Sequence, residues 1–182
     1  MYKIGFCGAH GTGKTTLARL INEQIKLPFL TDTARQMWRD FGIDEFEKLP
    51  VTVRSYFQKE IILKIITREE TEGVQGFISD RTVMDNWGYT KLSANMDTVD
   101  LRIYERIVKQ HIMTYTHFVY IPVSSQFRAE QDKLRANLET QDTFASIIEE
   151  SLSWVDPSKL LIIQNSELDL RVKEVINFVN IN

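Results

Sequence analysis

The sequence predicts an α/β fold in which five parallel strands form a sheet that helices cover on both faces, a three-layer αβα arrangement. Short apolar runs alternate with segments whose apolar residues recur at helical spacing. A glycine-rich turn joins the first run directly to a helix. No repeat, low-complexity tract or linker interrupts the chain, so we expect one domain over residues 1–182.

The first strand leads into a phosphate-binding motif. The apolar run Ile4–Cys7 ends at Gly8, and Gly8–Thr15 reads G-x-x-x-x-G-K-T. A helix follows, as shown by the spacing of Leu17, Ala18, Ile21 and Ile25. This strand, turn and helix form the context of a P-loop, whose backbone N–H groups cradle phosphates while its lysine reaches the β- and γ-phosphates and a hydroxyl holds Mg²⁺.

The loop supplies the predicted nucleotide contacts. Its glycines permit positive φ angles and close approach of the backbone to a polyphosphate. His10 can touch a phosphate, although the variable positions of such a loop accept many residues. The expected ligands of ATP are Gly8, His10, Gly11, Thr12, Gly13, Lys14, Thr15 and Thr16, with Thr15 also on Mg²⁺.

The later elements follow from periodicity and from glycine and proline positions. Further strands are expected at 27–32, 77–80, 117–121 and 160–164. Helices are expected at 33–40, 50–72, 84–94, 97–115, 128–152 and from 166 onward. Ligands of such sheets bind beyond the carboxyl ends of the strands, so residues at those ends are candidate site residues.

Composition narrows the class of protein. The chain is 43% hydrophobic and 26% charged, with a net charge of -3 and a pI near 5.7, which is typical of a globular protein and argues against a nucleic acid partner. Cys7 is the only cysteine, so neither a disulfide framework nor a cysteine metal site is available. We expect a cytoplasmic protein with no membrane partner.

Two acids stand at strand ends. Asp80 follows Phe77–Ser79 in the manner of a Walker-B acid, which makes it the candidate for the magnesium side. Asp32 lies one strand away and is the candidate for meeting the acceptor hydroxyl as a general base. Each acid could instead cap the helix that follows it.

Arginines could stabilise a phosphoryl group in transfer. Arg81 adjoins Asp80, and Arg35 follows Asp32, so both should face one crevice. Arg128 and Arg135 flank Asp132 on one helix face, and the functional interpretation makes 124–152 a helical lid over the phosphates. The alternative is an exposed helix with an ordinary ion pair.

The expected acceptor contacts are Asp32, Arg35, Arg39, Tyr56 and Arg81. Trp38, Arg39 and Tyr56 could wall the acceptor pocket, but amphipathic packing explains the two aromatic residues equally well, and Trp87 and Tyr89 share that ambiguity. A monophosphate acceptor would need cations, which Arg35, Arg39 and Arg54 could supply. His111 and His117 have no partners at metal-ligand spacing and are expected to be structural.

These residues resemble the small P-loop nucleoside and nucleotide kinases. The similarity rests on Gly8–Thr15, on Thr31–Arg35, which is similar to an E-Y-A-R-like segment, and on Asp80–Thr82, which is similar to a D-R-Y or E-R-S segment. The chain most resembles nicotinamide-riboside-kinase-like domains, which are AAA-type ATPase/kinase domains, and more distantly thymidylate and deoxynucleoside kinases. Asp32 departs from the family's usual glutamate.

The resemblance implies a P-loop NTPase fold with strand order 2-3-1-4-5. It implies that Lys14 and Thr15 bind ATP phosphates and Mg²⁺, that Asp32 meets the acceptor, and that Asp80 supports the metal. It also places Arg81, Arg128 and Arg135 around the moving phosphoryl group. Together with Lys14 and Asp32, these three arginines are the expected catalytic residues.

The leading hypothesis is therefore ATP- and Mg²⁺-dependent phosphoryl transfer to a small nucleoside or nucleoside monophosphate. An NTP hydrolase or a nucleotide-switched interaction module is an alternative, and a kinase that acts on a DNA base or end is a third. The sequence leaves the acceptor and the oligomeric state open.

Overall fold

The computed structural model describes residues 1–93, 96–123 and 138–180. Its sheet has five parallel strands in the order β2-β3-β1-β4-β5, which confirms the expected topology. The strands are β1 (Lys3–Cys7), β2 (Phe29–Leu30), β3 (Phe77–Asp80), β4 (His117–Tyr120) and β5 (Leu160–Ile162). Their order places the P-loop, which follows central β1, between the ends of β3 and β4.

The predicted helices are found with small shifts at their ends, except that only residues 138–151 of the helix expected at 128–152 are described. They are α1 (Lys14–Ile25), α2 (Thr33–Asp40), α3 (Val51–Thr71), α4 (Val83–Ser93), α5 (Thr98–Ile112), α6 (Leu138–Ser151) and α7 (Leu168–Asn180). Short 3-10 turns, η1 (Phe46–Lys48), η2 (Leu152–Trp154) and η3 (Pro157–Lys159), complete the described elements. Residues 124–137 of the predicted lid, including Arg128, Asp132 and Arg135, lie outside the described residues.

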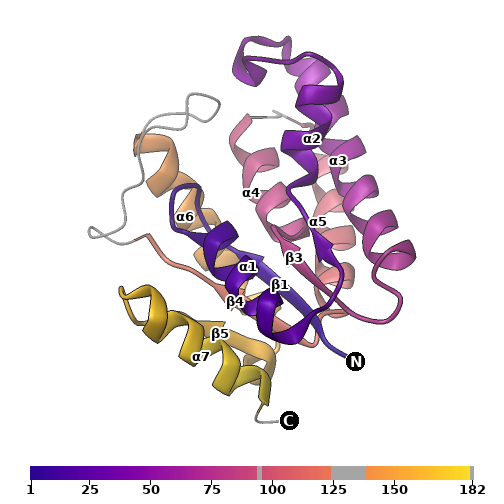
Figure 1. The fold of residues 1–182 in the computed structure, drawn as a ribbon. Coiled ribbons are helices and arrows are strands. Elements are labelled where there is room, and N and C mark those ends of the chain that lie inside the picture. The colour runs from indigo at the N-terminus through magenta and orange to yellow at the C-terminus, as the bar shows by residue number, and fades with distance from the viewer. Residues whose placement is uncertain (94–95, 124–137, 181–182) are drawn as a thin grey trace.

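The helices form a layer on each face of the sheet (Figure 1). On one face, α1 and α7 pack against each other and bury Leu17, Ile21, Val175 and Val179 with β1 and β4. On the other face, α3, α4, α5 and α6 pack around a larger core, and α4 contacts the other three helices. The three-layer αβα prediction is therefore confirmed.

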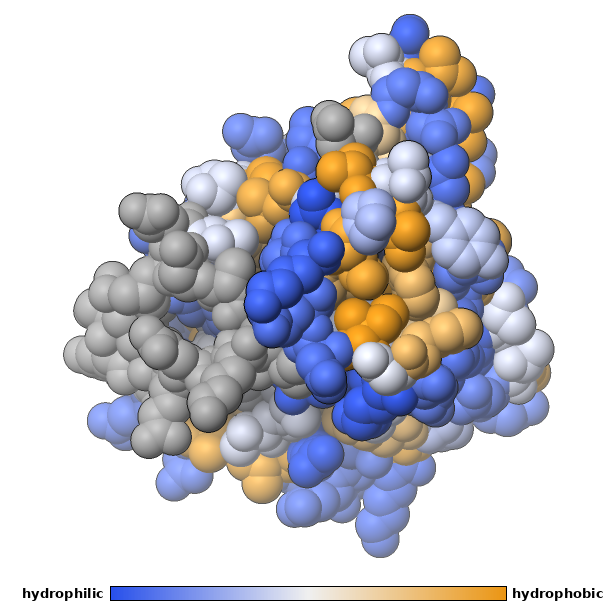
Figure 2. Space-filling model, turned by 90° about the horizontal axis from the view of Figure 1, so that it is seen from above, coloured by the Kyte–Doolittle hydropathy of each residue, from blue (hydrophilic) through white to orange (hydrophobic). Residues whose placement is uncertain are grey.

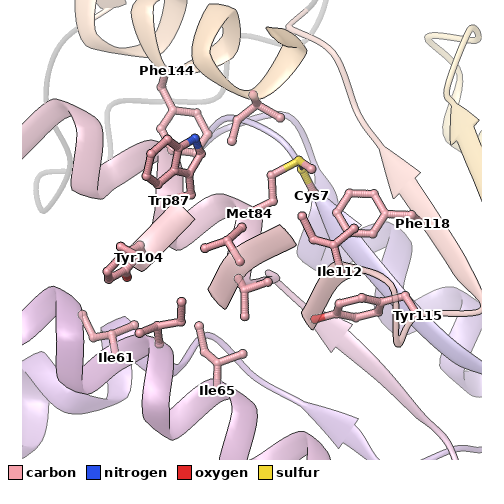
Figure 3. Packing of buried hydrophobic residues seen from close by; sticks show 14 of the residues in the cluster. Cys7, Ile61, Ile65, Met84, Trp87, Tyr104, Ile112, Tyr115, Phe118 and Phe144 are labelled. Atoms are coloured by element: carbon pink, nitrogen blue, oxygen red, sulfur yellow. Dashed lines mark hydrogen bonds between the residues drawn. The ribbon is translucent and has the colours of Figure 1, made fainter. Parts of the chain in front are cut away.

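The larger core fixes the start of α4 against the sheet. Cys7 at the end of β1 and Met84 in the first turn of α4 are both fully buried, and their sulfur atoms lie 3.8 Å apart (Figure 3). Trp87 and Phe144 pack in the same cluster. The end of β1 and the start of α4 are thus one packed unit, which gives the site above them a rigid base.

The histidines that the sequence left as structural lie inside the fold. His111 Nε2 lies 2.6 Å from Glu69 Oε2, and the other oxygen of Glu69 accepts a 2.5 Å hydrogen bond from Tyr115. His117 in β4 stacks edge-on against Phe178 of α7. In the described part of the chain, no helix is both long and apolar enough to span a membrane.

Candidate active site

The P-loop has the backbone conformation that its glycines predict. Gly8, Gly11 and Gly13 have φ angles of 141°, 76° and 87°. A Cβ atom at Gly8 would lie only 2.4 Å from the carbonyl oxygen of Ile121, so no side chain fits there. Glycine is therefore required at Gly8 both for its dihedral angle and for the close approach of the next strand end.

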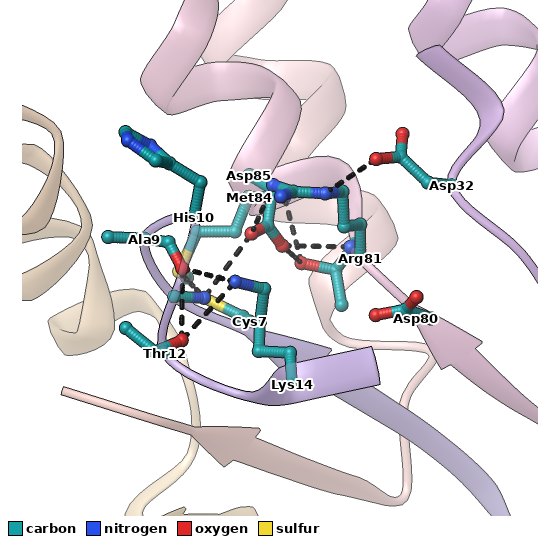
Figure 4. A network of polar contacts seen from close by, with 12 residues as sticks. Cys7, Ala9, His10, Thr12, Lys14, Asp32, Asp80, Arg81, Met84 and Asp85 are labelled. Carbon is teal, nitrogen blue, oxygen red and sulfur yellow. Dashed lines mark hydrogen bonds and ion pairs between the residues drawn. The ribbon is translucent and has the colours of Figure 1, made fainter. Parts of the chain in front are cut away.

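Lys14 points back across the loop (Figure 4). Its buried ammonium group donates hydrogen bonds to the carbonyl oxygen of Ala9 and, at 3.4 Å, to Thr12 Oγ1. Burial, with a further contribution from the charge of Arg81, lowers the pKa of Lys14 to about 8. A bound polyphosphate would supply the negative charge that this buried cation needs.

Thr15 and Asp80 form the pair expected of a cation site. Thr15 Oγ1 donates a 2.7 Å hydrogen bond to Asp80 Oδ2, so the acid at the end of β3 reaches the first turn of α1. Asp80 Oδ1 is buried and has no hydrogen-bond partner among the described residues. A hard cation with oxygen ligands, such as Mg²⁺, fits this hydroxyl and this unsatisfied carboxylate oxygen.

Within the described residues, no group of three or more His, Cys, Asp or Glu side chains could hold a metal on its own. Mg²⁺ in phosphoryl-transfer sites is held by one or two protein oxygens together with substrate phosphates and water. The donor set of Thr15 and Asp80 has that character.

Asp32 and Arg81 meet at the other side of the site. Arg81 Nε donates a 2.9 Å hydrogen bond to Asp32 Oδ2, and Asp32 Oδ1 accepts a 3.2 Å bond from the backbone N–H of Arg35. Asp32 is therefore the N-cap of α2, which was the alternative expected for it, and it is also the partner of Arg81. The Arg35 side chain approaches Asp32 at 3.9 Å and is 40% exposed.

Arg81 has an unusual backbone conformation. Its φ angle is 103°, in the left-handed region that disfavours residues with a Cβ atom and costs on the order of 1–3 kcal/mol. Its N–H donates to the carbonyl oxygen of Phe6 at 3.2 Å, and its own carbonyl accepts a 2.6 Å bond from Ser79 Oγ. The fold holds this strained residue at the carboxyl end of β3, where strain is typical of functional sites.

Asp85 is a site residue that the sequence analysis missed. This buried carboxylate accepts hydrogen bonds from the backbone N–H of Gly8 at 3.2 Å and from Thr82, whose N–H and hydroxyl lie at 2.9 and 3.1 Å. Arg81 Nη1 is 3.5 Å away. Burial raises the pKa of Asp85, and the charges of Arg81 and Lys14 oppose that shift. The Asp80-x₄-Asp85 spacing, with the second acid in the first turn of a helix, was the available signal.

Two cavities adjoin this polar cluster. One holds about 170 Å³ and is lined by His10, Trp38, Phe46, Glu47, Gln58, Tyr89, Leu92, Ser93, Thr140 and Phe144. A smaller one of about 20 Å³ reaches Asp32, Arg81 and Asp85. Trp38, Gln58 and Tyr89 line both cavities, so the larger space continues towards the Asp32–Arg81 pair. From above, the molecule shows apolar surface bordered by hydrophilic residues (Figure 2).

Gln58 is the most buried polar residue shared by the cavities. It lies in α3, and its Oε1 accepts a 2.5 Å hydrogen bond from Asn86 Nδ2 of α4. The hydroxyl of Tyr104 donates to the Gln58 carbonyl oxygen at 3.0 Å and also bonds Asn86 Oδ1. Three helices therefore fix the position of this amide at the cavity wall.

The structure brings together only some of the predicted acceptor residues. Asp32 and Arg81 line the smaller cavity, and His10 lines the larger one. Tyr56 is 60% exposed, and neither Tyr56 nor Arg39 lines either cavity. Trp38, which the sequence left ambiguous, lines both. Thr12 is buried, and Thr16 is exposed on α1.

Later elements also hold the P-loop. Gln141 of α6 donates a 2.6 Å hydrogen bond to the carbonyl oxygen of His10. Arg171 of α7 donates to the carbonyl oxygen of Thr12 at 3.0 Å and to that of Asn165 at 2.8 Å. These bonds satisfy loop carbonyls and leave N–H groups of the loop to face a ligand.

Solved structures with the same fold include two kinases and the NadR protein. A deoxyadenosine kinase from M. mycoides with bound dCMP and dCDP has a TM-score of 0.73 and 16% identity, covering 99% of this chain and 100% of that chain. The NadR protein in complex with NR has a TM-score of 0.76 and 18% identity, covering 100% of this chain and 52% of that chain. A thymidylate kinase from Ehrlichia chaffeensis has a TM-score of 0.64 and 15% identity, covering 98% of each chain.

At these identities the likeness establishes the fold. This chain spans about half the length of NadR and nearly all of the two kinases. Sheet order, P-loop geometry and these likenesses together define the class: a P-loop protein with the fold of nucleoside and nucleotide kinases, as the sequence resemblance implied.

The family follows from a sequence comparison. Residues 3–162 match the AAA domain family, and the chain belongs to that family. A comparison with curated protein sequences gives no match.

Proposed function

We propose that this protein is an ATP- and Mg²⁺-dependent kinase that phosphorylates a hydroxyl group of a small nucleoside. The observation that supports this most is the position of the Asp32–Arg81 pair. The pair lines the smaller cavity, which shares Trp38, Gln58 and Tyr89 with the larger one, and the larger one also reaches His10 of the P-loop that carries the buried Lys14. A hydroxyl in that cavity would meet an acid that can take its proton and a cation that can stabilise the phosphoryl group.

The charges of the cavity favour an unphosphorylated acceptor. Among the described residues that line the two cavities, Arg81 is the one arginine, and it already faces Asp32 and Asp85. The larger cavity adds the carboxylate of Glu47. Arg54, which could have served a monophosphate, instead donates a 2.9 Å bond to Glu47. An acceptor that carries its own phosphate would meet more negative than positive charge here.

The size and lining of the larger cavity favour a small acceptor with an aromatic ring. Its volume of about 170 Å³ lies below the roughly 300–1,000 Å³ of typical ligand pockets, which argues against a polymer end. Trp38 and Phe46 are stacked with their ring centroids 5.1 Å apart, and both face the cavity. A nucleobase can stack on such rings while Gln58 bonds its edge.

The proposed chemistry assigns one role to each side chain. The acceptor hydroxyl oxygen attacks the γ-phosphorus, its proton passes to Asp32, and the bond between the γ-phosphorus and the bridging oxygen breaks to release ADP. Lys14 stabilises charge on the β- and γ-phosphate oxygens, and Arg81 donates to the oxygens of the group in transfer. The hydrogen bonds from Arg35 N and Arg81 Nε orient both oxygens of Asp32, which supports its assignment as the proton acceptor.

Thr15 and Asp80 would hold Mg²⁺. When bound, the metal neutralises charge on the phosphates of ATP. The unsatisfied Asp80 Oδ1 and the Thr15 hydroxyl bonded to Asp80 Oδ2 are the features of this chain that fit it.

A panel of acceptors tests the proposal. The protein is mixed with ATP, Mg²⁺ and single nucleosides or their 5′-monophosphates, and ADP and the phosphorylated product are measured together. We expect equimolar ADP and nucleoside monophosphate with at least one nucleoside. Faster turnover of a monophosphate would contradict the assignment of the acceptor. ADP release that no acceptor changes would favour an NTP hydrolase, and steeply salt-dependent oligonucleotide binding would favour a DNA substrate.

A further inference from the structure

We propose that Asp85 is a positioning residue that holds the Arg81 guanidinium between the P-loop and the acceptor. The inference rests on the proposed kinase function and adds a residue to it. Asp85 lines only the smaller cavity of about 20 Å³ and is nearly inaccessible to solvent, so it acts through Arg81.

The contacts of Asp85 join two parts of the chain that lie far apart in sequence. Its Oδ1 accepts from the N–H of Gly8, the first P-loop residue, and lies 3.5 Å from Arg81 Nη1. Its Oδ2 is bonded by the N–H and hydroxyl of Thr82. The loop that binds the donor and the arginine that faces the acceptor are therefore fixed to one carboxylate (Figure 4).

Asp85 attracts Arg81 without using the hydrogen-bonding capacity of Nη1. The pair is within ion-pair distance, yet Arg81 Nη1 has no hydrogen-bond partner in the part of the chain that the structure describes, although it is buried. Arg81 Nε, in contrast, is bonded to Asp32. A buried donor without an acceptor is costly unless a ligand completes it, and a phosphoryl oxygen is an acceptor of the right charge.

The strained backbone of Arg81 explains why a second anchor is needed. A residue at φ 103° reverts to an ordinary conformation unless its surroundings fix it. The hydrogen bonds of Phe6 and Ser79 fix its main chain, and Asp32 fixes Nε. Asp85 supplies the attraction on the other side of the guanidinium, so the group stays between its two carboxylates.

A double-mutant cycle tests this assignment. Asp85→Asn keeps the shape of the side chain and one acceptor oxygen, so it retains either the Gly8 or the Thr82 hydrogen bonds, and it removes the charge that attracts Arg81. We expect kcat to fall about 10²-fold, as for the loss of one aligned transition-state donor, with the Kd of a non-hydrolysable ATP analogue changed by less than about threefold. In an Arg81→Ala background the same substitution should lower kcat no further, because its effect passes through Arg81.

A merely structural role gives a different result. If Asp85 only stabilised the fold, its effect would add to that of Arg81→Ala, and such additivity would overturn the proposal. Glu69→Gln is the matched control: it neutralises another buried carboxylate, bonded to His111 and Tyr115, and should lower thermal stability while leaving kcat unchanged. If Asp85→Asn does not fold, Thr82→Val removes one hydrogen bond to Asp85 and should show the same dependence on Arg81.

The activity of the wild-type chain distinguishes a failure of the proposed function from a failure of the Asp85 assignment. If it transfers no phosphoryl group to any acceptor, the proposed function fails and this inference fails with it. If the wild type is active and the Asp85→Asn variant keeps its kcat, the inference alone is wrong.

Discussion

The donor and acceptor halves of the site are built in opposite ways. The donor half is one stretch, Gly8–Thr15, whose backbone geometry follows from its own glycines. The acceptor half comes from three helices that lie far apart in sequence, with Asp32 at the start of α2, Gln58 in α3 and Asp85 in α4. Local sequence therefore specifies how phosphate is bound, whereas tertiary packing specifies what receives it.

The two halves also differ in how their polar groups are satisfied. On the donor side, Asp80 Oδ1 lacks a partner among the described residues, and Lys14 is buried against loop carbonyl and hydroxyl oxygens. On the acceptor side, Arg35 N and Arg81 Nε bond the two oxygens of Asp32, while Arg81 Nη1 is buried without a hydrogen-bond partner among the described residues. The donor side therefore favours a charged ligand. The acceptor side, where Asp32 already pairs with Arg81, favours an acceptor that carries less charge.

The largest effect should come from the donor half. Lys14→Ala removes the cation that stabilises the β- and γ-phosphates, so we expect turnover to fall about 10³-fold or more with every acceptor. Steady-state kinetics with two different nucleosides would measure it. Lys109→Ala, which loses a partly exposed pair with Glu105 and a cation–π contact with Trp154, neither of which involves the P-loop, should keep wild-type turnover. Near-normal activity of the Lys14 variant would undo the assignment of the donor half.

Asp32→Asn should separate the two halves. The amide keeps an oxygen for the Arg35 N–H but cannot take the acceptor proton, so we expect kcat to fall about 10²-fold. The Kd of an ATP analogue, measured by calorimetry, should stay near the wild-type value because Asp32 bonds Arg35 and Arg81, which lie outside Gly8–Thr15. An equal loss of ATP binding would instead assign Asp32 to the support of Mg²⁺.

The contrast between the halves also explains what could be predicted from sequence. Gly8–Thr15 carries its structure in local spacing, and the strand and helix periods indicated the elements, whereas the sheet order was implied by the family resemblance. Asp32 and Arg81 could be predicted as site residues because residues at strand ends share one edge of a parallel sheet. Their direct hydrogen bond was not predictable, since it depends on the strained φ angle of Arg81.

Other residues of the acceptor half gave no local signal. Gln58 sits in a long helix whose apolar stripe explains its neighbours, and only the packing of α3 against α4 brings it to Asn86. Tyr56 was expected in the pocket because it is aromatic, yet it lies on the exposed side of the same helix. Two residues, about half a turn of helix, separate the exposed face from the cavity face, and composition does not reveal that difference.

Gln58→Leu should weaken acceptor binding without changing ATP binding. The substitution keeps the volume of the side chain but removes the amide that faces the cavity, so we expect the acceptor KM to rise roughly tenfold while the Kd of the ATP analogue stays unchanged. Thermal stability should be measured too, because Asn86 loses a partner. A loss of ATP affinity of the same size would show that the two halves are not separable at this position.

The smallest expected effect is a pH dependence confined to the donor half. The pKa of Lys14 in the free protein is lowered from its usual 10.5 to about 8, and bound phosphates should raise it again. The affinity for an ATP analogue should therefore weaken several-fold as the pH rises from 8 to 9.

In the same range the unfolded chain binds more protons at this lysine than the folded chain does, so the contribution of Lys14 to stability without ligand should increase. Calorimetric titrations across pH 8 would measure the affinity, and Lys14→Ala should give a flat profile. If the variant kept the wild-type slope, the titrating group would lie elsewhere, and the buried lysine would not be what distinguishes the donor half.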